Sequence, residues 1–131
     1  MFEGYNFNNA PENYSDDDLT RAWIADCTDE GDASQKWAAR ELNDLVRDEP
    51  DRAWNIILAL AERVSKPEDK SVLAAGPIED LLSKHGSTFI DRVEQRAKSN
   101  PMFNYLLGGV WRSGMTENIW NRLQAARKEV W

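Results

Sequence analysis

The chain has 131 residues, of which 41% are hydrophobic and 30% are charged, and this is the size and composition of one globular domain. A single cysteine and a single histidine exclude an internal disulfide and a structural zinc site, so we expect no metal and no other cofactor. A formal net charge of −7 disfavours nucleic acid as a partner. No apolar run reaches the roughly 18 residues of a membrane span, and residues 1–5 lack the pattern of a signal peptide, so we expect a cytoplasmic protein that does not enter a membrane.

Residues 1–14 are predicted to form an irregular arm, and residues 15–131 a single helical domain. The arm contains four asparagines and Pro11 and shows no helical periodicity. Its aromatic side chains, Tyr14 among them, are candidates to pack against the domain.

From residue 15 onward, apolar residues recur with the period of helices that bury one face. The predicted helices begin at residues that favour the first turn or its cap, and these are Ser15, Asp32, Pro50, Pro67, Ser87, Asn100 with Pro101, and Thr116. No stretch alternates with the period of two that a half-buried strand requires. The sequence therefore predicts an all-α protein of six to eight short helices, arranged as a compact bundle or a short stack of αα-hairpins.

The third predicted helix has the widest apolar face and is expected to be the most buried, with Ile57 and Leu58 on that face. The pair at residues 76–77, Gly-Pro, is expected to break or kink the helix that precedes it. Gly86 is expected to end the next helix. The last helix is expected to turn Val130 toward the core.

Four short motifs in the second half of the chain carry a family resemblance. They are LAAGPIEDLL at residues 73–82, HG at 85–86, FIDRVE at 89–94 and LLGGVW at 106–111. Together they resemble a family of small, all-helical bacterial proteins catalogued as a domain of unknown function, over about residues 52–125. The resemblance implies an all-α fold and a bacterial or phage origin, and it brings no activity and no catalytic residue.

Charge is distributed unevenly along the chain. Residues 1–51 carry 14 acidic and 4 basic side chains, whereas residues 52–131 carry 9 acidic and 12 basic side chains. An acidic surface aids solubility, and it also attracts a basic partner and speeds association with it, so both interpretations stay open. The partner-binding candidates in this half are Asp17, Asp18, Asp29, Glu30 and Asp32.

Aromatic and basic residues near the end of the chain offer a second candidate surface. Trp111 and Trp120 lie close in sequence to arginines, of which Arg112 is the nearest to Trp111. Tryptophan and arginine are enriched where protein interfaces concentrate their binding energy. The alternative is that these rings pack on neighbouring helices or on the apolar stems of arginines.

The densest polar cluster contains Glu79, Asp80, His85 and Arg92. Glu79 and Asp80 are candidates for acid–base chemistry, or for binding a metal ion with His85. However, His85 falls on the apolar stripe of its predicted helix and near its carboxyl end, which favours a structural histidine. We therefore assign no catalytic residue.

Two classes of function remain. The favoured hypothesis is a non-enzymatic acidic module that binds another protein, of the inhibitor or immunity type, and acts on a basic partner. The alternative is a small enzyme that uses Glu79, Asp80 and His85, for which His85 must lie exposed in a pocket. A homo-oligomer joined through the aromatic last helix is a further alternative.

Overall fold

The computed structural model describes residues 11–27 and 37–131, and every regular element in these ranges is helical. In chain order the elements are α1 (Asp16–Cys27), α2 (Trp37–Asp48), α3 (Pro50–Arg63), α4 (Pro67–Leu73), the π-helix η2 (Ala74–Ile78), α5 (Glu79–Ser99), α6 (Pro101–Leu107) and α7 (Glu117–Ala126). This confirms the predicted all-α fold. Within the described ranges, no helix is both long enough and apolar enough to cross a membrane.

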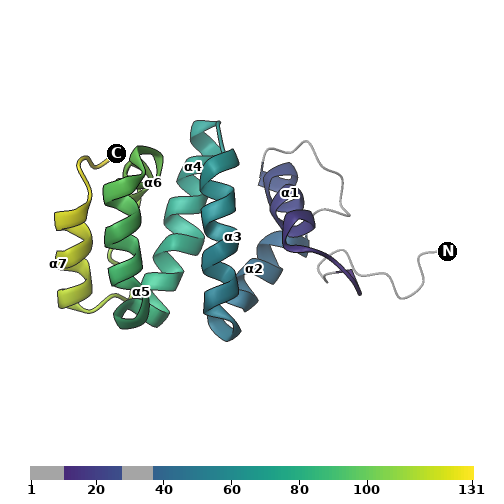
Figure 1. The fold of residues 1–131 in the computed structure, drawn as a ribbon, viewed down its shortest axis with the longest axis horizontal. Helices are drawn as coiled ribbons and strands as arrows, with labels where there is room; N and C mark the ends of the chain where they lie inside the picture. The colour runs from purple at the N-terminus through teal and green to yellow at the C-terminus, as the bar shows by residue number, and fades with distance from the viewer. Residues whose placement is uncertain (1–10, 28–36) are drawn as a thin grey trace.

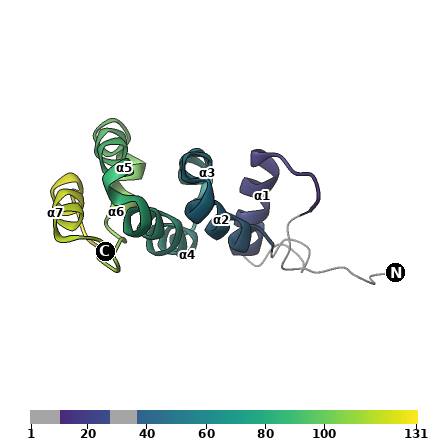
Figure 2. The ribbon, with the colours of Figure 1, turned by 90° about the horizontal axis from the view of Figure 1, so that it is seen from below.

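The helices are arranged as a short stack rather than around a single central axis (Figure 1). The helices α1, α3, α5 and α7 follow one another along the long axis of the molecule, and α2 and α4 lie to one side of α1 and α3 (Figure 2). Helices that are consecutive in the chain pack together, as α1 does with α2, α2 with α3, and α5 with α6. Of the two predicted arrangements, the structure favours the stack of αα-hairpins.

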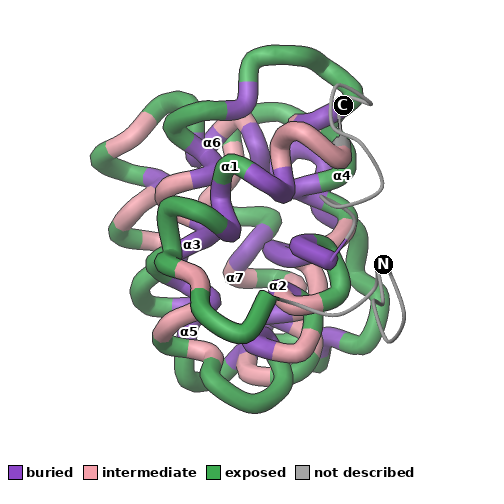
Figure 3. The backbone as a smooth tube through the Cα atoms, turned by 90° about the vertical axis from the view of Figure 1, so that its right-hand side faces the viewer, coloured by how far each residue is buried: buried purple, intermediate pink, exposed green. Residues whose placement is uncertain are grey.

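The helix α3 lies at the centre of the hydrophobic core. It contacts α1, α2, α4, α5 and α6, which explains why its apolar face must be wide. Ile57 and Leu60 are completely buried, as predicted for this helix. Figure 3, seen from the α1 end, shows buried residues in purple alternating with intermediate and exposed ones along the helices. Leu58, which was also expected on this face, is only partly buried, because it lies at the flank of the face where α3 meets solvent.

Most of the predicted helix starts are confirmed by their caps. The Ser15 hydroxyl accepts a hydrogen bond from the Asp18 amide, and the Asp18 carboxylate accepts one from the Ser15 amide, both at 3.0 Å. These two bonds form a capping box at the start of α1. The side chains of Asn100 and Thr116 likewise accept hydrogen bonds from amides three residues onward. Two further helices begin at the predicted prolines, Pro50 and Pro67.

The Gly-Pro pair at residues 76–77 does not break the helical path. Pro77 is buried inside the π-helix η2, which joins α4 directly to α5. Proline has no amide hydrogen, and in an α-helix its ring meets the carbonyl of the fourth residue before it. The wider π turn accommodates both effects, so the chain continues as a helix through the proline.

The helix break predicted at residues 86–87 is confirmed to within one residue, since α5 consists of two helical segments that meet at a kink. The kink lies at His85, whose backbone angles of φ −133° and ψ 34° are not helical. A Cβ atom on Gly86 would lie 2.9 Å from Cγ1 of Ile119 in α7. The glycine therefore lies beside the predicted helix boundary and also permits the close approach of α7 to α5.

The end of the chain also differs from the prediction. The helix α7 ends at Ala126, and Val130 is 66% exposed instead of facing the core. The Lys128 amide donates a hydrogen bond to the buried side chain of Asn104 at 3.0 Å, which draws the chain away from the helical path. Residues 127–131 then return to α6, where the Trp131 amide donates to the Gly108 carbonyl at 3.0 Å.

The described part of the predicted arm is held by Tyr14. Its hydroxyl donates a hydrogen bond to Glu41 of α2, and its ring lies 5.1 Å from the ring of Trp37. The Arg52 guanidinium of α3 covers the same ring at 5.2 Å. Burial, followed by the hydrogen bond to Glu41, raises the pKa of Tyr14 to about 12. Residues 1–10 lie outside the described ranges.

Candidate functional site

The acidic candidates of α1 are already paired within the chain. Asp17 accepts a hydrogen bond from Arg63 of α3 at 2.7 Å and forms a second ion pair with Arg21 at 2.9 Å. Asp18 pairs with Arg21 at 2.8 Å and belongs to the capping box. The bond from Arg63 lowers the pKa of Asp17, and the bonds from Ser15 lower the pKa of Asp18. The other acidic candidates, Asp29, Glu30 and Asp32, lie outside the described residues.

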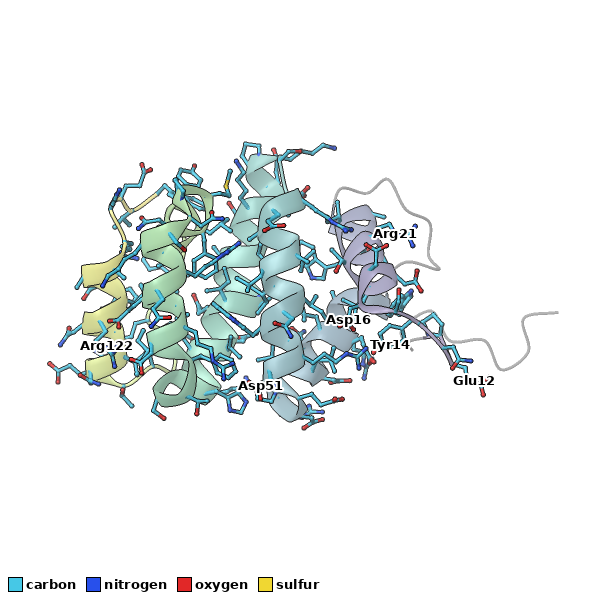
Figure 4. The ribbon with its side chains drawn as sticks, viewed as in Figure 1. Glu12, Tyr14, Asp16, Arg21, Asp51 and Arg122 are labelled. Carbon is cyan, nitrogen blue, oxygen red and sulfur yellow. The ribbon has the colours of Figure 1, made fainter. Side chains whose placement is uncertain are left out.

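Similar ion pairs join successive helices along the stack. Arg52 of α3 binds Asp16 of α1 at 2.8 Å, and Arg92 of α5 binds Asp51 of α3 at 2.7 Å. At the far end of the stack, Arg122 of α7 binds the carboxylates of Asp91 and Glu94 in α5. Figure 4 labels Asp16, Asp51 and Arg122, one member of each of three of these pairings. The arginines of the second half of the chain thus neutralise carboxylates of the first half. Asp16, Asp17 and Asp51 of the acidic half are therefore each paired with an arginine of the other half.

The single histidine has a structural hydrogen bond. His85 Nε2 lies 2.8 Å from the backbone carbonyl oxygen of Val46, near the end of α2. In a continuing helix that carbonyl would accept from residue 50, but Pro50 has no amide hydrogen to donate. His85 supplies the missing donor across the α2–α5 contact. The predicted structural role is therefore supported, although the carbonyl belongs to α2 and not to the histidine's own helix.

The remaining members of the polar cluster point to different partners. Glu79 accepts a hydrogen bond from the Trp111 amide at 2.8 Å. Arg92 pairs with Asp51 and lies 4.6 Å above the ring of Phe89. Asp80 is partly buried, and the described contacts give its carboxylate no hydrogen bond or ion pair. The structure thus keeps these side chains engaged separately and does not assemble them into one site.

Cavities give the enzyme hypothesis no support. Three hollows of about 470, 300 and 240 Å³ lie on the described residues, and none is lined by Glu79, Asp80 or His85. No group of three or more histidine, cysteine, aspartate or glutamate side chains is placed to hold a metal ion in the described part of the chain. A pocket with convergent polar groups is the usual setting of catalysis, and this cluster lacks one.

Among the residues that the structure describes, the most exposed aromatic side chain is that of Trp111. It is 66% exposed, although its backbone amide is fixed to Glu79. Close by in the fold, the Trp131 indole donates to the Tyr105 carbonyl at 2.6 Å, and its ring stacks on the ring of Tyr105 at 5.1 Å. Val130, next to Trp131, is also 66% exposed. We use the name aromatic face for Tyr105, Trp111, Val130 and Trp131, which lie in α6, shortly after it, and in the C-terminal segment that returns to it.

Some of the other aromatic and basic side chains near the end of the chain are occupied by contacts within the chain. Trp120 is partly buried, and the Arg127 guanidinium lies 5.0 Å above its ring. For Trp120 the structure therefore favours packing against an arginine over an open partner surface. Arg127 also donates to the carbonyls of Leu107 and Val110 beyond the end of α6. Arg112 is exposed and makes one long bond, 3.4 Å, to the Met115 carbonyl. Of the predicted surface, Trp111 and Arg112 therefore remain accessible.

Sequence reasoning missed Val130 as a member of this face, and it named Trp131 as a surface candidate without placing it against α6. The helical period was extended through residue 130, which placed Val130 in the core. The signal that was available is the pair Gly108 and Gly109, because a Cβ atom on either would lie 2.6 Å from the Trp131 side chain. Two adjacent glycines thus mark the place where the tryptophan crosses the end of α6.

Comparison with known proteins adds a family and nothing on activity. No curated protein and no solved structure matches the chain. A family model described as "Family of unknown function (DUF6869)" matches residues 25–130. The match includes all four motifs that carried the resemblance and begins well before residue 52. The chain therefore belongs to this family of unknown function.

Proposed function

We propose that the chain is a non-enzymatic protein-binding module of the bacterial cytoplasm, and that it binds its partner through the aromatic face. The observation that supports this most directly is the exposure of Trp111 on a fixed backbone. Because the amide of Trp111 is bonded to Glu79, the backbone at this position loses little conformational entropy when a partner covers the ring. Such anchors supply most of the binding energy in many interfaces.

The aromatic face fits this role better than the acidic surface of α1. Asp17 and Asp18 already neutralise Arg21 and Arg63, so a basic partner would have to compete with the chain's own arginines. An inhibitor of a basic protein remains a narrower form of the proposal. It would depend on the acidic residues outside the described ranges.

Photo-crosslinking in the native host tests where the partner binds. A photoreactive residue at position 111 is compared with one at position 40, since Arg40 is exposed on α2, at the other end of the stack from α6 and the C-terminal segment (Figure 1). We expect a discrete protein adduct from position 111 and none from position 40. Equal adducts from both positions, or no adduct from position 111, would contradict the proposal.

Affinity measurements with the identified partner then test the role of Trp111. Trp111→Ala should weaken binding at least about 30-fold, the effect of losing a central aromatic anchor. Its free energy of unfolding should change by less than about 0.5 kcal/mol, because the side chain is mostly exposed. Glu79→Ala should weaken binding by releasing the Trp111 amide, whereas Glu79→Gln keeps an acceptor oxygen and should restore most of the affinity.

A further inference from the structure

A hollow on the described residues lies between α5, α6 and the end of α7. It has a volume of about 470 Å³, within the range of roughly 300–1,000 Å³ that is typical of small-ligand sites. Small side chains create it, since Ala97 of α5 and Ala125 and Ala126 of α7 line its walls. It is separate from the aromatic face, whose residues do not line it.

The floor of this hollow is held in place by Asn104. Its amide nitrogen donates to the carbonyls of Ala97 and Ala126 at 3.2 and 3.0 Å, and its oxygen accepts from the Lys128 amide at 3.0 Å. One buried side chain thus joins the end of α5 to the end of α7. The hollow is consequently part of a braced framework and not a gap between loosely packed helices.

The charges around the hollow favour an anion. Glu94 lines one wall, but its carboxylate is bonded to Arg122 at 2.6 and 3.0 Å, a guanidinium that it shares with Asp91. Lys98 and Lys128 also line it, and neither ammonium group has an ion-pair partner in the described contacts. They belong to two different walls, one on α5 and the other just after α7.

The other two hollows lack this combination. The hollow of about 300 Å³ is lined by Arg92 and Arg96, but these arginines already pair with Asp51 and Glu62. The hollow of about 240 Å³ contains one lysine and mainly polar neighbours. Only the first hollow joins an alanine surface to two unpaired cations in the described contacts.

We propose that the hollow between α5, α6 and α7 binds a small carboxylate with an apolar body. The apolar part would lie on the three alanines, where it leaves water, and the carboxylate would lie between Lys98 and Lys128. Neither contact requires the aromatic face, so this site goes beyond the proposed protein-binding function.

Benzoate and its uncharged analogue benzamide provide matched probes for this site. The full chain is titrated with each compound while the backbone amide signals are followed by nuclear magnetic resonance. Benzoate should cause saturable shifts at Ala97, Asn104 and Ala126, and benzamide should bind at least about threefold more weakly. The double variant Lys98→Gln, Lys128→Gln should weaken benzoate binding about three- to tenfold, towards the affinity for benzamide.

Two further variants separate occupancy of the hollow from a general charge effect. Ala125→Phe places a ring in the hollow from an exposed helix position and should abolish the saturable shifts, while the rest of the spectrum stays native. Lys84→Gln removes an exposed lysine elsewhere on α5 and should leave benzoate binding unchanged. The proposal is overturned if benzamide binds as tightly as benzoate, if Ala125→Phe leaves the shifts intact, or if the shifts map to another surface. It is also overturned if no shift saturates by about 10 mM benzoate, ten times a Kd of about 1 mM.

Discussion

The two ends of the helical stack differ in what they leave exposed. At the α1 end, the carboxylates of Asp16 and Asp17 bind arginines of α3 at 2.8 and 2.7 Å. At the other end, Trp111 and Val130 are each 66% exposed. In the described structure, several carboxylates of the first half are therefore paired within the chain, while the second half leaves apolar side chains exposed. A charge pattern in sequence is a poor guide to a partner surface when stacked helices bring complementary charges together.

The centre of the stack, which both ends share, should show the largest response to mutation. Ile57→Ala removes a completely buried side chain of α3 and should lower the free energy of unfolding by about 2–5 kcal/mol. Leu58→Ala is the matched control, because its side chain is only partly buried, and should cost less than about 1.5 kcal/mol. Urea unfolding followed by tryptophan fluorescence measures both. Equal losses for the two variants would show that α3 presents a different face to the core.

At the α6 end, Asn104 should be the most sensitive polar residue. Asn104→Ala leaves the carbonyls of Ala97 and Ala126 and the Lys128 amide without their partner, at a cost of about 1–3 kcal/mol. Asn55→Ala, on the exposed side of α3, should change stability by less than about 0.5 kcal/mol.

Amide hydrogen exchange locates the effect of Asn104→Ala. We expect faster exchange in α7 and the last residues, with little change in α1 and α2. A uniform change along the chain would mean that the α6 end does not open separately from the rest.

The local features of the fold could be predicted from the sequence. Ser15, Asn100 and Thr116 mark helix starts because a cap depends on residues within one turn of it. The apolar period likewise identified α3 as the most buried helix. Gly86 was correctly interpreted as a helix boundary, but its contact with Ile119, 33 positions away, could not be predicted from local sequence.

The candidate site was predictable only in part. Trp111 could be named as a candidate from its residue type, because tryptophan is enriched among the residues that dominate interface binding energy. That inference needs no knowledge of which residues surround it in the fold. The pairing of Asp17 with Arg63 joins residues 46 positions apart, so no local pattern could indicate that this carboxylate is occupied. The same holds for His85, whose partner is the Val46 carbonyl that Pro50 leaves free.

A smaller effect is expected at the α1 end in alkaline solution. Because the folded chain raises the pKa of Tyr14 from 10.0 to about 12, the neutral phenol is favoured in the folded state. Its contribution to stability is complete below about pH 10 and is lost as the pH rises towards 12. Ultraviolet absorbance measures the formation of tyrosinate as the pH rises. The Tyr14→Phe variant should lack one tyrosine that the wild-type chain ionises well above pH 10. Loss of an ordinary tyrosine titration instead would contradict the contact with Glu41.

The smallest effect is expected from the exposed ion pair between Asp17 and Arg63. Arg63 lowers the pKa of Asp17, so the pair stabilises the fold above the ordinary pKa of aspartate and loses its effect as the pH falls through the lowered value. Asp17→Asn and Arg63→Gln should each destabilise slightly at neutral pH, less so at high salt, and their effects should not add in the double variant. Acid unfolding curves of the four proteins measure this coupling. If the curves show none, the Asp17 carboxylate is free in solution, and the acidic surface of α1 again competes with the aromatic face as the partner site.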